Sequence, residues 1–141
     1  MLQKEIKLIP KEEIFTILPL LMKLNKKTSE EVLKKRLLEM CEQNYKCIGL
    51  YIDKKLVGIS GLWFLTRHYC GPTIEPDHVI IDASYRNKGL GKELFEWIRD
   101  YALKMGCEAL ELNTFIHNTK SHRFYEELGY KKLGYHYLKI F

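Results

Sequence analysis

The sequence predicts a mixed α/β (α+β) domain whose central sheet combines antiparallel and parallel strands. Two strand-like segments flank the polar stretch Asp53–Lys55 and therefore form an antiparallel hairpin. A strand, a long amphipathic helix and another strand follow, and such a unit pairs its strands in parallel through a right-handed crossover. The length of 141 residues is close to that of one typical domain, so residues 1–141 are expected to form a single domain.

The first third of the chain predicts one strand and two helices. The stretch from Lys4 to Ile9 alternates as a short strand does. Apolar residues then recur at helical spacing from Lys11 to Leu24, and Pro19 is expected to kink or divide that helix. Thr28 and Glu31 have the spacing of a capping box, so the second helix should begin there.

Strands and helices alternate through the rest of the chain. Gly106 suits the end of the longest predicted helix, and Gly129 suits the end of the last one. The full predicted order is β-α-α-β-β-β-α-β-α-β-β, in which the elements after the second helix are strands at Lys46–Ile52, Leu56–Leu65 and His78–Ile81, a helix at Gly89–Met105, a strand at Ala109–Phe115, a helix at Thr119–Leu128, and final strands at Tyr130–Leu133 and Tyr135–Ile140.

Composition narrows the range of functions. The formal net charge of +5 favours anionic ligands such as a phosphate-bearing small molecule, without the dense basic patch of a nucleic-acid binder. The longest apolar stretch, Leu56–Leu65, is too short and too interrupted to span a membrane. The N-terminal sequence lacks the apolar core of a signal peptide, so we expect a cytoplasmic protein with no membrane partner. Its four cysteines include no C-x-x-C pair, and neither disulfides nor a metal are expected.

One segment has the chemistry of an anion site. A buried strand leads into a loop with glycines at 89 and 91, and this loop opens the longest helix. Glycines let backbone amides approach an anion, and a helix start offers unpaired N–H groups with partial positive charge. The alternative is a simple tight turn with solvated cations. We interpret the segment as a diphosphate site made by Arg86, Asn87, Lys88, Gly89, Leu90, Gly91 and Lys92.

This loop differs from two better-known nucleotide motifs. Lys92 is followed by Glu93, which a Walker A loop does not allow. Leu94 stands where a dinucleotide-binding fingerprint needs a third glycine or alanine. Neither of those folds is predicted.

Two motifs together resemble the GNAT superfamily of acyl-CoA-dependent N-acetyltransferases. Arg86, Gly89 and Gly91 match the R-x-x-G-x-G motif, and a second motif is matched by Asn118, Tyr125, Gly129 and Tyr130, with Ser121 in place of the usual alanine. The predicted element order also agrees with that family. A weaker resemblance links the C-terminal stretch to the aminoalkylphosphonate-acetylating branch. The resemblance implies acetyl-CoA as co-substrate, and because such enzymes are often dimers, it makes a homodimer possible.

The resemblance also implies roles for individual residues. The backbone of Val79, Ile80 and Ile81 would pair with the pantetheine arm of the cofactor, and the Arg86–Gly91 loop would hold its pyrophosphate. Asn118, with Ser121, would touch the cofactor. Tyr125 would protonate the departing thiolate, and a phenol with a pKa near about 10 can do so at neutral pH. Packing beside Phe124 and Leu128 is the alternative role for Tyr125.

A base is needed because an amine with a pKa of about 10.4 is almost fully protonated at neutral pH. Glu75 is our first candidate for this base, followed by Asp77 and Glu111. Glu75 and Asp77 lead into the predicted strand His78–Ile81, and Glu111 lies in the strand expected beside it. Each carboxylate could instead be solvated or paired. His78 is an alternative base.

The candidate acceptor site lies at the end of the third predicted strand. Its substrate-binding candidates are Trp63, Arg67, Tyr69 and His78. They could form an aromatic-walled pocket in which Arg67 binds an anionic group of the acceptor. An aromatic sheet face with a solvated arginine is the equal alternative.

The sequence therefore predicts an N-acetyltransferase that moves an acetyl group from acetyl-CoA to a primary amine, by direct attack in a ternary complex. The acceptor is expected to be a small molecule, with an anionic amine favoured. The alternatives are a protein or peptide amine acetyltransferase and a non-catalytic acyl-CoA-binding regulatory module. A nucleic-acid partner is not expected because glutamates dilute the basic runs.

Overall fold

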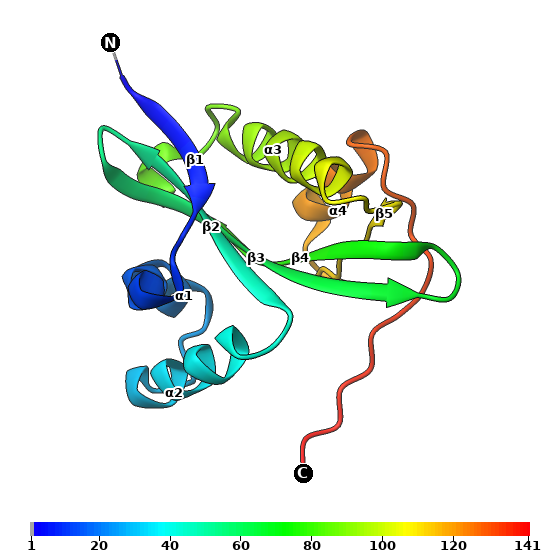
Figure 1. Ribbon diagram of the computed structural model, residues 1–141, viewed down its shortest axis with the longest axis horizontal. Coiled ribbons are helices and arrows are strands. Elements are labelled where there is room, and N and C mark those ends of the chain that lie inside the picture. Colours follow the sequence, from blue (N-terminus) through cyan, green and yellow to red (C-terminus); the bar gives the residue numbers. More distant parts are fainter. Residues whose placement is uncertain (1) are drawn as a thin grey trace.

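The computed structural model describes residues 2–141 and has a curved five-stranded sheet with helices on both faces (Figure 1). The mixed α/β class predicted from the sequence is confirmed. In chain order the elements are β1 (Lys4–Leu8), the 3-10 helix η1 (Lys11–Ile17), α1 (Leu18–Leu24), α2 (Glu30–Cys41), β2 (Tyr45–Ile52), β3 (Lys55–Arg67), β4 (Gly71–Ile81), the 3-10 turn η2 (Ala83–Tyr85), α3 (Leu90–Lys104), β5 (Ala109–Leu110) and α4 (Thr119–Glu127).

The sheet runs in the order β1-β2-β3-β4-β5, with four antiparallel strands and a parallel last one. The predicted hairpin is β2–β3. Its two turn residues, Asp53 and Lys54, have φ angles of 47° and 68°, which match the twist of a tight antiparallel turn. The predicted parallel crossover through α3 is also confirmed, although β4 and β5 pair only at Thr73 with Ala109 and at Ile74 with Leu110.

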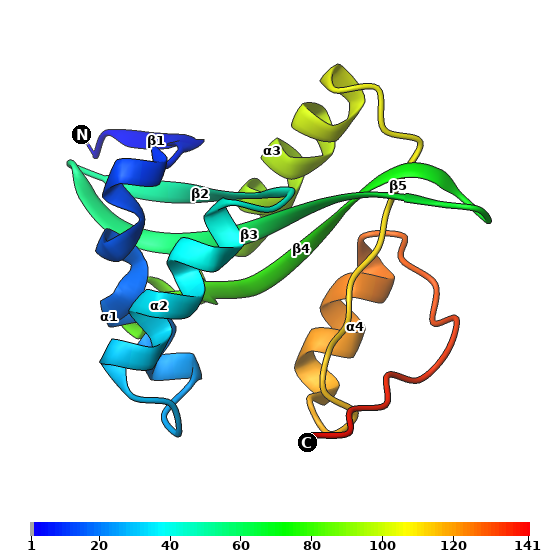
Figure 2. The same ribbon diagram turned by 60° about the horizontal axis from the view of Figure 1, so that its bottom comes forward.

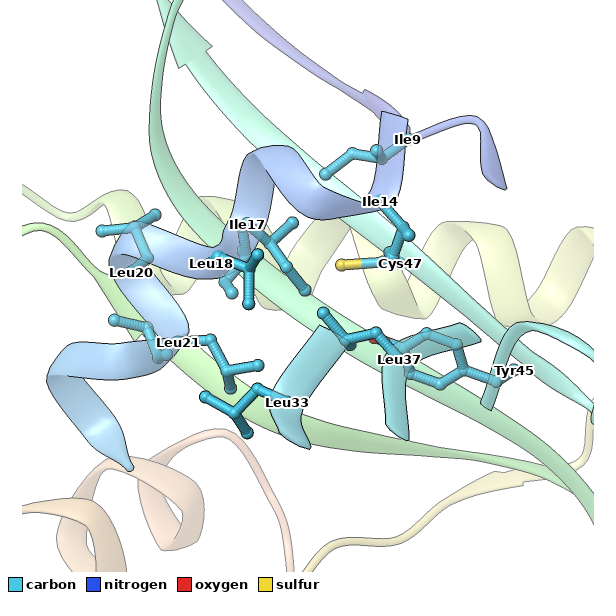
Figure 3. Close-up of a cluster of buried hydrophobic side chains, with 12 residues drawn as sticks. Ile9, Ile14, Ile17, Leu18, Leu20, Leu21, Leu33, Leu37, Tyr45 and Cys47 are labelled. Atoms are coloured by element: carbon cyan, nitrogen blue, oxygen red, sulfur yellow. The ribbon is translucent and has the colours of Figure 1, made fainter. Parts of the chain in front are cut away.

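Two apolar layers hold the sheet between its helices. One face packs against α1 and α2 through buried residues such as Ile17, Leu37 and Tyr45 (Figure 3). The opposite face packs against α3, where Leu94 and Ile98 are fully buried. The α4 helix packs against α3 (Figure 1), and α1 and α2 lie together across the sheet from α3 (Figure 2).

Helix boundaries follow local chemistry, with one difference from the sequence prediction. Pro19 stands at the start of α1, which follows a 3-10 helix, so the predicted division of the helix is confirmed. The cap of α2 is Ser29 rather than Thr28, because the Ser29 hydroxyl accepts a hydrogen bond from the N–H of Val32 at 3.3 Å.

The predicted strands after α4 are not formed, which corrects the sequence-based order. Tyr130–Leu133 and Tyr135–Ile140 have no strand pairing, and Leu133, Tyr137 and Ile140 are more than four-fifths exposed. The predicted strand Ala109–Phe115 is reduced to the two residues of β5. A strand requires an edge with which to pair, and β5 is too short to offer one to the C-terminal segment.

Candidate active site

The Arg86–Gly91 loop leads from β4 into α3 as the sequence predicts. Gly89 caps α3 with a φ of 76°, in the left-handed region that glycine adopts without strain, and a Cβ there would meet no atom within 4 Å. Asn87 also has a positive φ, 61°. The start of α3 therefore has open space beside Gly89, and the first N–H groups of a helix have no partner within the helix, as an anion site requires.

The side chains of this loop are exposed, and one of them ties the loop to β4. Arg86 donates from Nε to the carbonyl oxygen of Ile81 at 3.0 Å. Lys88 lies over the ring of Tyr85, with Nζ 5.5 Å from the centroid. Gly91 faces the ring of Phe124 on α4, 3.6 Å from the position that a Cβ would take. Leu90 is buried against the sheet and anchors the start of α3.

The edge of β4 that leads to this loop is open. On one side β4 pairs with β3 as far as Ile81, whereas on the other its ladder with β5 ends at Ile74. Beyond that point, no strand in residues 2–141 pairs with Val79–Ile81 on the β5 side. An extended chain with alternating donors and acceptors can pair with such an edge.

A cluster of charged side chains occupies the point where β4 leaves β5. Glu75 lies opposite Trp63 in the sheet, and the N–H of Glu111 donates to the carbonyl of Ile74, so both carboxylates share the face covered by α1 and α2. Arg67 lies on this face as well. It donates from Nε to Glu111 Oε1 at 2.5 Å and lies 3.6 Å from Glu75 Oε1.

Two further side chains complete the hydrogen bonds of this cluster. Tyr69 donates to the second oxygen of Glu111 at 2.6 Å, and Asn113 donates to Glu75 at 3.4 Å. Asn113 was not among the residues predicted for the site. Its place two residues after Glu111, on the same side of an extended chain, was the available signal.

The pKa values of the two glutamates move in opposite directions. Burial, followed by the negative charges of Glu111 and Asp77, raises the pKa of Glu75, and the nearby Arg67 only partly offsets this. Burial acts in the same sense on Glu111, but the hydrogen bonds from Tyr69 and Arg67 outweigh it and lower its pKa. Glu75 is therefore the stronger base of the two.

Asp77 and His78 belong to a separate polar row on the same face. Trp63 donates from its indole N–H to Asp77 Oδ2 at 3.0 Å, and the Tyr45 hydroxyl lies 2.7 Å from Nε2 of His78. Hydrogen bonding to His78 is the main cause that lowers the pKa of Asp77 to about 2. The His78 side chain is only 7% exposed and faces Tyr45 and Gly61, so a positioning role fits it better than proton transfer. The sequence analysis gave Tyr45 no role.

The remaining predicted residues lie on α4. The Asn118 side chain accepts a hydrogen bond from the N–H of Ser121 at 3.2 Å and so caps the helix. Tyr125 packs among aromatic rings on the α3 side, with centroids of Phe95 and Phe124 both 5.4 Å away. Burial raises the pKa of Tyr125, which keeps its hydroxyl protonated at neutral pH.

Two further properties concern the described residues as a group. None of the helices in residues 2–141 is both long and apolar enough to cross a bilayer. Over the same residues, no cluster of three or more His, Cys, Asp or Glu side chains could hold a metal ion.

Comparison with known proteins agrees with this geometry. The model of the acetyltransferase (GNAT) family matches residues 14–130, which include the glycine loop, the charged cluster and α4. The fold and site thus define an acyl-CoA-dependent N-acetyltransferase. The chain belongs to the acetyltransferase (GNAT) family.

Individual relatives differ in the acceptor that their names state. An uncharacterized N-acetyltransferase of Bacillus subtilis is 27% identical over 94% of both chains. A spermine/spermidine N(1)-acetyltransferase of the same species is 28% identical over 64% of this chain and 62% of its own length. The aminoalkylphosphonate N-acetyltransferase of Salmonella typhimurium is 29% identical over 51% of this chain and 47% of its own length. The chain therefore spans less than two thirds of the last two relatives.

Solved structures share the fold. An aminoglycoside N-acetyltransferase solved in complex with CoA superimposes with a TM-score of 0.85, over 99% of this chain and 95% of that one, at 15% sequence identity. A likeness at this identity concerns the fold, and it agrees with the mixed five-stranded sheet described above.

Proposed function

We propose that this protein transfers the acetyl group of acetyl-CoA to the primary amine of a small molecule by direct attack in a ternary complex. The observation that carries this proposal is the place of Glu75. A carboxylate with a raised pKa lies where β4 leaves β5, next to the open edge of β4. The family membership supports this edge and the adjoining glycine loop as the place where the cofactor would bind.

The cofactor would be held mainly by backbone groups. Its pantetheine arm would pair with Val79–Ile81, and its diphosphate would accept hydrogen bonds from the N–H groups at the start of α3. Arg86, Lys88 and Lys92 would add positive charge near the phosphates. Acetyl-CoA should therefore stabilise the folded protein, because a ligand that binds only the folded state raises the free energy of unfolding.

The reaction needs one base and one acid. Glu75 takes a proton from the ammonium group, and the free amine attacks the thioester carbonyl carbon. The C–S bond of the resulting tetrahedral intermediate breaks, the nitrogen releases its second proton to water, and the thiolate of CoA takes the phenolic proton of Tyr125. The products are the N-acetylated amine and CoA, and both residues exchange protons with water before the next cycle.

The charges at the site favour an acceptor with a second positive group. Arg67 is already paired with Glu111 and Glu75, and Asp77 lies close enough to raise the pKa of Glu75, so negative charge exceeds positive charge there. This local excess is opposite in sign to the net charge of +5. The anionic amine favoured by the sequence would meet an arginine whose Nε and Nη2 are already paired with carboxylates, whereas a diamine would meet the carboxylates themselves.

A matched amine panel tests both levels of the proposal. Propylamine, 1,3-diaminopropane and 3-aminopropylphosphonate have the same carbon chain and differ in the charge at the far end. With acetyl-CoA present, release of free thiol should be fastest with the diamine and slowest with the phosphonate. Faster turnover of the phosphonate would return Arg67 to an anion-binding role.

A substitution isolates the base. Glu75→Gln keeps the shape of the side chain and the hydrogen bond of Asn113 to its oxygen, but cannot accept the proton. General-base catalysis is worth about 10²- to 10⁴-fold, so kcat/KM for the amine should fall by that order while acetyl-CoA still stabilises the fold. Unchanged turnover would remove Glu75 from the mechanism.

The alternatives make different predictions in the same assay. A non-catalytic module would be stabilised by acetyl-CoA without amine-dependent release of thiol. A protein or peptide acetyltransferase would acetylate a lysine peptide in preference to every small amine. Cytoplasmic location and a homodimer stay predictions from the sequence.

A further inference from the structure

The β4 strand contains a bulge one residue beyond Asp77. Ile59 pairs with Ile80 and Gly61 pairs with Asp77, so two residues of β4 lie opposite the single residue between them on β3. One of these two residues is His78, whose φ of 37° is in the left-handed region that a histidine rarely adopts. Something other than backbone preference must hold His78 in this conformation.

The side chain of His78 is locked into the sheet by three contacts. It occupies the space above Gly61, where a Cβ would lie 2.5 Å from Nε2 and would overlap the ring. The Tyr45 hydroxyl lies 2.7 Å from the same nitrogen. Nδ1 faces the Asp77 carboxylate at 3.5 Å, and a proton on Nδ1 leaves Nε2 to accept the Tyr45 O–H.

Asp77 also holds the backbone of His78. Its Oδ1 accepts a hydrogen bond from the N–H of His78 at 2.8 Å, and its Oδ2 accepts one from Trp63 at 3.0 Å. The bulge is thus fixed from the backbone side and from the side-chain side. The whole arrangement depends on glycine at 61, since no other residue leaves room for the imidazole.

This lock lies between the two functional parts of β4. Glu75 precedes it by three residues, and the open edge Val79–Ile81 follows it directly. The strand changes the direction of its peptide groups at a bulge. The conformation of His78 therefore decides how the cofactor edge is oriented relative to the base.

We propose that His78 is a positioning residue, and that its ring, seated over Gly61 and bonded to Tyr45, sets the orientation of the Val79–Ile81 edge for acetyl-CoA. This inference rests on the proposed function, because it assumes that the cofactor uses that edge. His78 itself touches neither reactant and carries no proton in the reaction.

A double-mutant cycle tests the lock. Gly61→Ala adds a methyl group that must displace the ring, so the Kd for acetyl-CoA should rise by about tenfold. In a His78→Asn background the ring is gone, while asparagine still tolerates a positive φ. There the added methyl group still meets the Tyr45 ring, 2.8 Å away, but that ring can shift once its bond to His78 is lost, so the Kd should change by less than about twofold. An equal loss in both backgrounds would overturn the proposal.

A second variant covers the case in which Gly61→Ala does not fold. Tyr45→Phe keeps the aromatic ring and removes only the hydroxyl that bonds His78. It should raise the KM for acetyl-CoA by a few fold with a smaller change in kcat, a split that general destabilisation does not produce. A fall in kcat alone, with KM unchanged, would contradict a role in cofactor positioning.

The controls separate this inference from the proposed function. Gly49→Ala places a methyl group on the same face of the sheet, 2.7 Å from a Leu56 side-chain atom rather than against His78, and it should leave the affinity for acetyl-CoA unchanged. If the parent protein is not stabilised by acetyl-CoA, the proposed function fails. If the parent binds acetyl-CoA and the cycle shows no coupling, only the lock fails.

Discussion

The two faces of the sheet differ in whether their polar side chains have hydrogen-bond partners. On the face covered by α1 and α2, the Tyr45 hydroxyl, the Trp63 indole and the carboxylates of Glu75 and Glu111 all have hydrogen-bond partners. On the α3 face, Tyr130 has a buried hydroxyl with no partner in the described residues. Its neighbour Tyr125 has a pKa that only burial raises, without a charge or hydrogen bond acting on it.

This difference separates groups that are oriented in advance from groups that await a ligand. A carboxylate held by Arg67 and Asn113 has a fixed direction before the substrate arrives. A tyrosine hydroxyl among aromatic rings gains a strong partner only when one enters. The face with fixed partners suits the base, and the other face suits the acid that meets the departing thiolate.

The largest effect is expected from Tyr125→Phe. Removal of the hydroxyl should lower kcat by about 10²- to 10⁴-fold, because no proton donor then meets the thiolate. The ring keeps its contacts with Phe95 and Phe124, so the melting temperature and the affinity for acetyl-CoA should stay close to those of the parent. Steady-state kinetics and thermal unfolding with and without cofactor measure all three.

Loss of the parent's thermal stability without loss of turnover would show that Tyr125 only packs. The Tyr125 hydroxyl on the α3 side would then have no ligand to meet, and the two faces would not differ in the way proposed.

The next largest effect is expected at the start of α3, where backbone N–H groups would bind the diphosphate of acetyl-CoA. Asparagine and aspartate both tolerate the positive φ of Gly89, and they differ only in charge. Acetyl-CoA at 100 times its Kd should stabilise the parent by about 2.7 kcal/mol. Gly89→Asn should keep much of this stabilisation, and Gly89→Asp should lose nearly all of it at low salt.

Equal ligand stabilisation of these two variants would place the diphosphate elsewhere. A high-salt measurement serves as the control, because screening should bring the aspartate variant closer to the asparagine variant.

The pattern of residues was sufficient to predict the parts of this site that depend on local chemistry. The glycine loop, α3 and the parallel crossover each follow from short-range signals, and the crossover predicted that the strand of Glu111 lies next to the strand that Glu75 precedes. The pairing of Arg67 with both glutamates was not predicted, because it depends on the register that sets Arg67 opposite Gly71. Sequence spacing alone does not specify that register.

Two other features could not be predicted from the sequence pattern. A bulge breaks the alternation of side chains, so the direction of the His78 ring cannot be obtained by counting along β4. The alternation in Tyr135–Ile140 is typical of a strand, yet a strand forms only where another strand offers an edge. The short β5 does not, and the segment stays exposed.

A smaller effect is expected in the pH dependence of kcat/KM, which is controlled by the carboxylates on the face covered by α1 and α2. The base must be ionised, so activity should fall as the pH drops through the pKa of Glu75, which lies above its ordinary value of 4.5. Arg67→Met removes the cation that lowers this pKa and should move the acidic limb of the profile of kcat/KM to higher pH. Glu111→Gln removes an anion that raises it and should move the limb to lower pH.

Shifts of the same sign in both variants would contradict this electrostatic account. Asp100→Asn, an exposed carboxylate on α3 that pairs with Arg99, is the control and should leave the limb unchanged.

The smallest effect is expected at Tyr130, the neighbour of Tyr125 with a ring centroid 5.9 Å away. Burial, followed by the charge of Tyr125, raises the pKa of Tyr130 to about 12, so its hydroxyl stays neutral and unpaired. Tyr130→Phe removes a buried donor without breaking a hydrogen bond, and should raise the free energy of unfolding by about 1 kcal/mol, or the melting temperature by about 4 °C. Its kcat should equal that of the parent, in contrast to Tyr125→Phe. A drop in kcat comparable to that of Tyr125→Phe would mean that the two hydroxyls act together on the thiolate, and the acid would then be the pair rather than one tyrosine.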